Sequence, residues 1–386
     1  MKAVLTSLAT ANPRRYASQQ EICAFLEGHF PMQPQERELY REILLEGPIR
    51  GRYIAVDEDE EICSQDPDRL IERFEKHGRR IATEAARKAL DQVGLTPAQI
   101  EGLVVNTCTG YLCPGLSSYL VEDLGLPAFT STLDLMGMGC GGAIPNLEAA
   151  CCMIQSGARK TVLCLSVEIC SATFFLGPDP DLIVSNSIFS DGASAAVLQA
   201  DLNGDLARST GILPVISNHG RDAHATETPH GVTTSKSPGH GLVRFLDFES
   251  VTLPKYREQL RYTTQGGRLR NVLTRNVPVI GAKAVGQVAH RLLERHGLTS
   301  QDISYWVVHP GGTQVLKAVG RQLDLTPETL RFSYETFRDY GNMSSPSVMF
   351  VLGKVLSEAR PGHGEKSLLI SFGAGFTAFA ALIEFP

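Results

Sequence analysis

The sequence lacks any apolar run of the roughly 18 residues that a membrane-spanning helix needs. The first segment, residues 1–13, holds too short an apolar run for a signal peptide. There is no CxxC pair, and the nine cysteines are an odd number that lie mostly in apolar segments. These absences argue against a disulfide-stabilised secreted domain and a transmembrane protein, and they favour a reduced, cytoplasmic protein.

Long basic runs are also missing, and the net charge is −6 at pH 7, which argues against a nucleic-acid partner. Histidines gather in residues 216–241, but their spacing fits no tight zinc pattern and the stretch has no cysteine. We therefore expect no metal site, and a solvated or partly ordered loop there. The histidines are His219, His224, His230 and His240.

The most informative pattern is an internal repeat in this chain of 386 residues. Residues 86–105 resemble residues 289–308 at a constant offset, and each copy predicts a helix, a glycine stop, a turn and a strand. The matched positions include Leu90 with Leu293, Gly94 with Gly297, Ile100 with Ile303, and Val104-Val105 with Val307-Val308. A chance match of two helix–turn–strand units is the alternative.

We predict an α/β fold with two halves, residues 1–200 and 201–386, related by a pseudo-twofold axis. Alternating strands and helices predict mostly parallel sheets packed between helices. Residues 201–270 are the least regular part of the sequence. Ser18 and Glu21 form a capping box that predicts the start of a helix.

Cys140 lies at the turn into a predicted helix. Apolar residues follow it at helical spacing, at Ile144, Leu147, Cys151 and Ile154. A thiol at a helix N-terminus faces unpaired N–H groups and the positive end of the helix dipole, which would lower its pKa. On this stretch alone, a nucleophile and a buried, unreactive cysteine are equally compatible with the pattern.

His309 directly follows the strand of the second repeat copy, in WVVHPGGT (306–313). Gly311 and Gly312 would let the backbone approach a ligand closely. Taken alone, His309 could equally be a structural histidine at the end of a strand.

Asn342 precedes a predicted helix, much as Cys140 does, although a turn asparagine is also common there. A pseudo-twofold would bring Cys140, His309 and Asn342 together. Such a set fits covalent acyl transfer, in which the histidine and the amide stabilise an oxyanion or an enolate.

In their order along the chain, these motifs resemble those of the type III polyketide synthases, the chalcone-synthase-like group of the thiolase fold. The resemblance runs from about residue 9 to the end of the chain. It implies two pseudo-twofold-related halves in a layered α-β-α-β-α core. The matching motifs are Gly139-Cys140, HPGG (309–312), YGNMSS (340–345), Phe189 in SIFSDGASAA (187–196), GYLCPG (110–115) and GAGF (373–376).

The resemblance implies a decarboxylating acyltransferase. Cys140 would take an acyl starter from a CoA thioester, and His309 and Asn342 would bind malonyl-CoA and stabilise the enolate formed on loss of CO2. The enolate would attack the acyl-Cys140 thioester, and the lengthened chain would cyclise to a pyrone or a resorcinol. Phe189 would be an aromatic gatekeeper, with a core phenylalanine as the alternative. The family also implies a homodimer, with no cofactor beyond CoA thioesters.

Further site residues follow from the same resemblance. Cys108 and Cys113 fall where the family shapes its cyclisation cavity, and their small side chains favour a fatty-acyl starter, as in bacterial alkylresorcinol and alkylpyrone synthases. Residues 266–278 also look like that bacterial branch. The substrate-contacting glycines would be Gly311, Gly312, Gly373 and Gly375. Arg50 and Arg52 are candidates for contact with the CoA phosphates, or else ordinary surface arginines.

Three other functions stay open. A ketoacyl synthase III has the same fold, but other residues surround its histidine and asparagine. A papain-like peptidase shares the order Cys, His, Asn but not the local sequence around the cysteine. A non-catalytic acyl-binding protein could also keep the fold. The sequence does not decide whether CoA or an acyl-carrier protein delivers the starter.

Overall fold

The structure is a computed structural model that describes residues 2–201, 233–234 and 241–386. The four histidines of the 216–241 stretch lie outside the described residues, so the loop predicted there stays a prediction.

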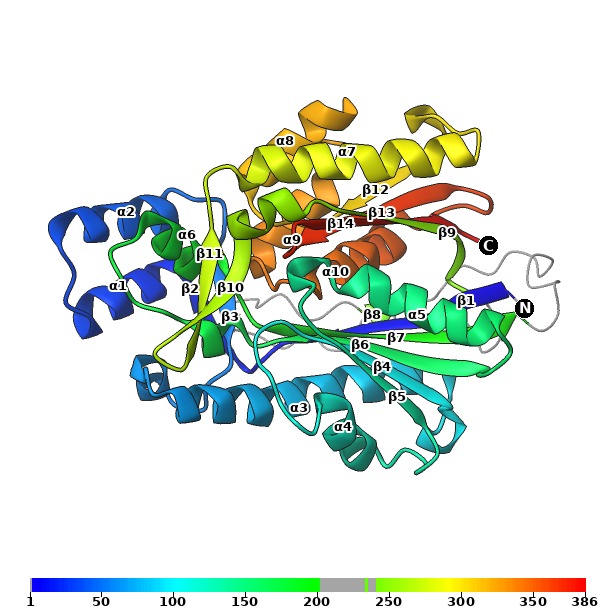
Figure 1. Ribbon diagram of the computed structural model, residues 1–386, viewed down its shortest axis with the longest axis horizontal. Coiled ribbons are helices and arrows are strands. Elements are labelled where there is room, and N and C mark those ends of the chain that lie inside the picture. The colour runs from blue at the N-terminus through cyan, green and yellow to red at the C-terminus, as the bar shows by residue number, and fades with distance from the viewer. Residues whose placement is uncertain (1, 202–232, 235–240) are drawn as a thin grey trace, which may run out of the picture.

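One large mixed sheet runs through the molecule (Figure 1). Its strands are β1 Lys2–Ala11, β4 Gly102–Asn106, β5 Ser131–Leu135, β6 Thr161–Glu168, β7 Gly192–Asp201, β8 Thr233–Thr234, β9 Val243–Thr252, β12 Tyr305–Val308, β13 Lys366–Gly373 and β14 Thr377–Glu384. They lie in the order β12-β13-β14-β9-β1-β7-β6-β4-β5, with β8 paired to β1.

The prediction of mostly parallel sheets is wrong. Only the pairs β4·β5, β4·β6 and β12·β13 of the described strands are parallel, and the central pairs are antiparallel. Residues 374–376 join β13 to β14, and so short a link allows a hairpin but not the crossover that parallel neighbours need.

The strand order repeats on the two sides of the centre. From the centre outward, β1-β7-β6-β4 and β9-β14-β13-β12 show the same sequence of antiparallel and parallel pairs. The two sides meet where Val4 and Leu5 of β1 pair with Arg244 and Val243 of β9. This symmetry supports the predicted division near residue 200, which stays a prediction.

Helices form three layers around this sheet. The described helices are α1 Gln19–His29, α2 Pro34–Leu45, α3 Pro67–Val93, α4 Leu116–Leu124, α5 Ala143–Gln155, α6 Pro180–Ile188, α7 Val277–Arg295, α8 Thr313–Leu323, α9 Arg331–Tyr340 and α10 Ser347–Lys354. Of these, α1, α2 and α6 lie together at one end of the molecule, outside the layers (Figure 1). Figure 1 shows α5 and α10 between the two sides of the sheet, with α3 and α4 on one outer face and α7 and α8 on the other. The layered α-β-α-β-α arrangement is therefore as expected.

The two repeat copies fold alike, as predicted. Helices α3 and α7 end just before Gly94 and Gly297, whose φ angles are 65° and 62°. A capped 3-10 turn follows each glycine, started by Thr96 in one copy and Thr299 in the other. The strands β4 and β12 complete the two units.

Smaller elements gather at one end of the sheet (Figure 1). The strands β2 Arg15–Ser18 and β3 Gly51–Ile54 form one pair, and β10 Leu260–Gln265 and β11 Arg268–Leu273 form another. The described part of residues 201–270 is therefore more regular than predicted. Helix α1 begins after Ser18, which makes the predicted capping box with Glu21.

Candidate active site

Cys140 lies in a single 3-10 turn, Gly139–Gly141, directly before α5. The apolar stripe of α5 that the sequence predicts is buried in the middle layer. Strand β13 packs closely against the Cys140 turn, and Ser371 Oγ donates a hydrogen bond to the Gly141 carbonyl over 3.2 Å. A Cβ at Gly373 would collide with the Met138 carbonyl and lie 3.0 Å from the Cys140 nitrogen, so this approach requires glycine.

Ser344 connects Cys140 to the Asn342 loop. The Ser344 hydroxyl lies 3.3 Å from Cys140 Sγ and 3.4 Å from Cys108 Sγ. The Ser344 N–H donates to Asn342 Oδ1 over 2.9 Å, which fixes the orientation of the amide. Its NH₂ group is thereby left to act as a donor.

Asn342 is connected in turn to His309. Asn342 Nδ2 donates to the Gly311 carbonyl over 3.4 Å, and the Gly311 N–H donates to the His309 carbonyl over 2.9 Å. The His309 ring is buried, and its Nδ1 has no hydrogen-bond partner among the described residues. The structure thus joins all three predicted residues through Ser344 and Gly311.

Sequence reasoning missed Glu168 as a site residue. Its side chain is fully buried at the end of β6 and accepts hydrogen bonds from Ser345 Oγ at 2.6 Å, Thr109 Oγ1 at 2.9 Å and the Cys108 N–H at 3.0 Å. Burial raises the pKa of Glu168, while these donors lower it. The signal was available, because Glu168 is the one charged residue in the apolar strand at 161–169.

Burial also decides the charge of the two reactive side chains. It raises the pKa of the Cys140 thiol to about 12, although the hydrogen bond from Ser344 works in the opposite direction. It lowers the pKa of His309 to about 3. The lowered thiol pKa expected from the helix N-terminus is therefore wrong for this site, because desolvation outweighs the dipole. Both side chains are neutral in the free site at pH 7.

Phe189 directly follows α6 and pairs with Asn342. The Asn342 N–H donates to the Ile188 carbonyl over 2.8 Å, and the Ser190 N–H donates to the Asn342 carbonyl over 2.9 Å. This short bridge places the predicted gatekeeper beside the predicted enolate-binding residue.

The remaining predicted site residues differ in their exposure and in their position in the fold. Cys113 is exposed, and Gly312 and Gly375 lie in the turns before α8 and β14. Arg50 is exposed, with its Nη1 3.6 Å from Asp339 Oδ1. Arg52 is only 5% exposed and its guanidinium binds protein groups, so the prediction that it meets CoA phosphates is wrong.

Within residues 2–201, 233–234 and 241–386, no group of three or more His, Cys, Asp or Glu side chains is arranged to hold a metal ion. None of the helices in the same ranges is both long and apolar enough to cross a membrane.

Two known protein families match this chain. Residues 55–219 match the family described as FAE1/Type III polyketide synthase-like protein, and residues 251–384 match the C-terminal domain of chalcone and stilbene synthases. Cys140, the predicted nucleophile, lies in the first match, and His309 and Asn342 lie in the second.

Curated relatives extend over nearly the whole chain. The 3,5-dihydroxyphenylacetyl-CoA synthase of Streptomyces toyocaensis is 31% identical, covering 89% of this chain and 82% of the relative. The 1,3,6,8-tetrahydroxynaphthalene synthase of Streptomyces peucetius subsp. caesius is 29% identical, covering 96% and 90%. The alpha-pyrone synthesis polyketide synthase-like Pks18 of Mycobacterium tuberculosis is 25% identical, covering 99% and 91%.

Solved structures show the same fold. PKS-I from the brown alga Ectocarpus siliculosus superposes with a TM-score of 0.81 at 24% identity, covering 100% of this chain and 98% of that one. The tetrahydroxynaphthalene synthase of Streptomyces coelicolor A3(2) gives 0.82 at 21% identity, covering 99% of each chain. The protein is an acyl-transferring condensing enzyme of the thiolase fold. It belongs to the type III polyketide synthase family.

The pKa directions predict how Cys140 responds to pH. Because the thiol is neutral at pH 7, only the small thiolate fraction reacts, and that fraction grows about tenfold per pH unit below the pKa. We predict that alkylation of Cys140 by iodoacetamide, followed by peptide mass spectrometry, accelerates continuously from about pH 6 to about pH 9. The exposed Cys152 on α5 is the internal reference. A plateau that begins below neutral pH would instead show a preformed ion pair with His309.

Proposed function

We propose that this chain loads an acyl starter on Cys140, extends it with malonyl-CoA by decarboxylative Claisen condensation, and cyclises the product to a pyrone or a resorcinol. The observation that carries the proposal is the chain of contacts from Cys140 Sγ through Ser344 to the Asn342 amide, and from there through Gly311 to His309. These contacts support a site in which Cys140 is the nucleophile, His309 the base and Asn342 a hydrogen-bond donor.

Loading follows from the neutral state of both groups. As Cys140 Sγ attacks the thioester carbonyl, neutral His309 accepts the thiol proton, which avoids an unpaired buried charge. The carbon–sulfur bond to CoA then breaks, and the imidazolium returns the proton to the departing CoA thiolate. His309 is neutral again, and Cys140 carries the acyl group.

In extension, His309 takes a second role as a hydrogen-bond donor, together with Asn342. The His309 N–H and the Asn342 NH₂ group bind the thioester oxygen of malonyl-CoA, where negative charge develops as CO2 leaves. The enolate carbon attacks the acyl-Cys140 carbonyl and the carbon–sulfur bond to Cys140 breaks. The departing thiolate takes up one proton from the solvent, which restores the neutral thiol for the next cycle. An amide suits this step because it donates hydrogen bonds but cannot remove a proton.

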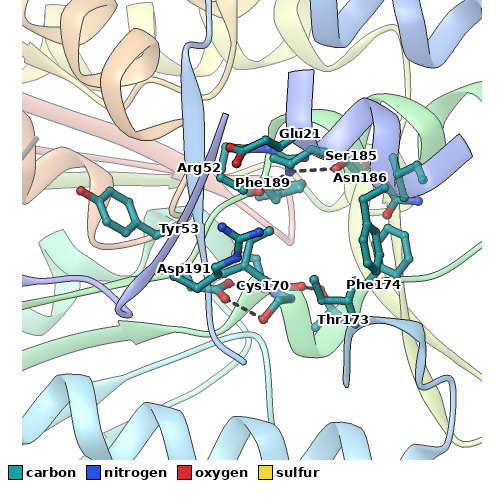
Figure 2. Close-up of a pocket in the computed structure, with 18 of the residues that line it drawn as sticks. Glu21, Arg52, Tyr53, Cys170, Thr173, Phe174, Ser185, Asn186, Phe189 and Asp191 are labelled. Carbon is teal, nitrogen blue, oxygen red and sulfur yellow. Dashed lines mark hydrogen bonds between the residues drawn. The ribbon is translucent and has the colours of Figure 1, made fainter. Parts of the chain in front are cut away.

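A largely apolar cavity beside Phe189 supports a fatty-acyl starter (Figure 2). It extends between α1 and α6, and its apolar side chains include Ile22, Phe25, Leu26, Phe174 and Leu182. Phe189 lines the cavity and is bridged to Asn342, so this residue connects the cavity with the reactive centre. The apolar lining suits an alkyl chain. Arg50 remains our candidate for the CoA phosphates.

The proposal includes a homodimer. Strand β5 ends the described sheet with one unpaired side, and Leu133 and Met136 at this edge are 36% and 39% exposed. Phe129, two residues before β5, is 96% exposed. Exposed apolar side chains at a sheet edge are typical of a covered interface. We expect a dimer in sedimentation velocity and a monomer after Phe129→Ser with Leu133→Ser. A wild-type monomer at assay concentration would contradict the dimer.

Substitutions of the reacting residues test the proposed chemistry. Cys140→Ala should abolish product formation from acyl-CoA and malonyl-CoA, because the acyl chain has no attachment point. Asn342→Ala should mainly slow malonyl-CoA decarboxylation, on the order of 10²–10³-fold, because one donor to the enolate is lost. Chromatography with mass spectrometry measures both, with the starter supplied on CoA and, in parallel, on acyl-carrier protein.

The matched control is Cys152→Ala, which removes an exposed thiol from the same helix that follows Cys140. It should leave product formation unchanged. Undiminished product from Cys140→Ala would overturn the proposed function.

A further prediction concerns the length of the acyl starter. Ile22→Trp should fill part of the cavity and lower kcat/KM for long acyl-CoA starters on the order of tenfold, while a short starter is used nearly as before. The control is Gln35→Trp on the exposed face of α2, away from the cavity lining. An equal loss for short and long starters would show that the cavity does not hold the acyl chain.

A further inference from the structure

Arg52 is a buried arginine whose direct partners among the described residues are amide and carbonyl oxygens. Its side chain is 5% exposed, and within the described parts of the chain no Asp or Glu oxygen lies within ion-pair distance of it. Burial lowers the pKa of Arg52, while the buried Asp191 carboxylate raises it from a longer distance. The direct contacts to the guanidinium come from other groups.

Those groups are backbone carbonyls at the end of α6. Arg52 Nη1 donates to the Asn186 carbonyl over 2.8 Å and to the Phe189 carbonyl over 2.6 Å. Arg52 Nε donates to Gln19 Oε1 over 3.0 Å, and Gln19 Nε2 donates onward to the Ser187 carbonyl over 3.1 Å. The cation thus sits at the negative end of the α6 dipole and holds the turn that carries Phe189.

The aliphatic part of the same side chain packs against the residue before Asn342. Gly341 has φ 72°, and a Cβ there would lie 3.1 Å from Arg52 Cγ and 2.8 Å from the Ile188 carbonyl oxygen. The Arg52 side chain therefore contacts the backbone on both sides of the bridge between Phe189 and Asn342.

We propose that Arg52 is a positioning residue that holds Phe189 and Asn342 in one fixed relation to Cys140. It acts on the reaction through Phe189 and Asn342 rather than through a contact with the reacting atoms. It sets the carbonyls after α6, which in turn fix the bridge to Asn342. This role rests on the proposed function of Phe189 and Asn342. Lysine cannot replace it, because one ammonium group lacks the planar fork that reaches Gln19 and two carbonyls together.

Other contacts keep the same segment folded without Arg52. The Tyr53 N–H donates to Ser190 Oγ over 3.0 Å, and the Asp191 N–H donates to the Tyr53 carbonyl over 3.0 Å. The Ala55 N–H also donates to Asp191 Oδ2 over 2.6 Å. Loss of Arg52 should therefore shift Phe189 and Asn342 rather than unfold the chain around them.

The test compares Arg52→Lys and Arg52→Ala with wild type in four measurements: melting temperature, alkylation of Cys140, decarboxylation of malonyl-CoA and product spectrum. We expect decarboxylation to fall on the order of 10²-fold, since small displacements of catalytic groups have effects of that size. The product spectrum should change in the same direction as that of a Phe189→Leu variant measured in parallel, because both substitutions disturb the predicted gatekeeper. Alkylation of Cys140 should stay within about twofold, because the Cys140 turn is held by β13 instead.

Two further variants and one chemical rescue extend the test. Arg41→Gln removes an arginine that is 57% exposed on α2 and should change none of the four measurements. Gln19→Leu removes one acceptor of Arg52 and should give the same pattern at smaller size. Low millimolar guanidinium chloride should partly restore decarboxylation in Arg52→Ala, because Arg52 lines the cavity.

Two results would overturn the role of Arg52. One is unchanged decarboxylation and product spectrum in folded Arg52 variants. The other is a parallel loss of melting temperature, alkylation and decarboxylation in both Arg52 and Gln19 variants, which a purely structural residue would give. Absence of decarboxylation by the wild-type protein would overturn the proposed function itself, and with it the role of Arg52.

Discussion

The contact between the Ser344 hydroxyl and the Cys140 thiol, 3.3 Å long, is the interaction on which the site depends. It joins a turn from the first half of the chain to a loop from the second. The contact exists only because β13 approaches the Cys140 turn at Gly373, and because α5 and α10 share the middle layer. Cys140 and Asn342 therefore lie on opposite sides of one seam between the two sides of the sheet.

Burial determines the protonation states of the reactive side chains at this seam. Desolvation keeps Cys140 and His309 neutral, so charge appears only when a substrate brings groups that compensate it. The same environment makes each hydrogen-bond donor more effective towards an enolate oxygen than it would be in water. Hydrogen bonds offset the desolvation of the buried Glu168 and Arg52 side chains. The Glu168 carboxyl group accepts them from hydroxyl and backbone N–H groups, whereas the Arg52 guanidinium donates them to backbone carbonyls.

The sequence predicts local features of this protein better than long-range ones. The capping box at Ser18 and the glycine stops at Gly94 and Gly297 are local signals, and the structure confirms them. Strand direction was mispredicted because it depends on which strands become neighbours. The prediction that Arg52 contacts CoA phosphates was wrong for a related reason. The carbonyls that surround it are distant in sequence, so nothing near Arg52 in the sequence reveals them. Motif order named Cys140, His309 and Asn342, but their connection through Ser344 and Gly311 is visible only in three dimensions.

The measurement that tests the central claim most directly is peptide mass spectrometry of the wild-type protein after incubation with a long-chain acyl-CoA alone, and again after malonyl-CoA is added. The account predicts an acyl thioester on the peptide that carries Cys140, which disappears on addition of malonyl-CoA as CO2 and an extended product are released. An acyl group on another cysteine, or an adduct on Cys140 that malonyl-CoA does not discharge, would contradict it.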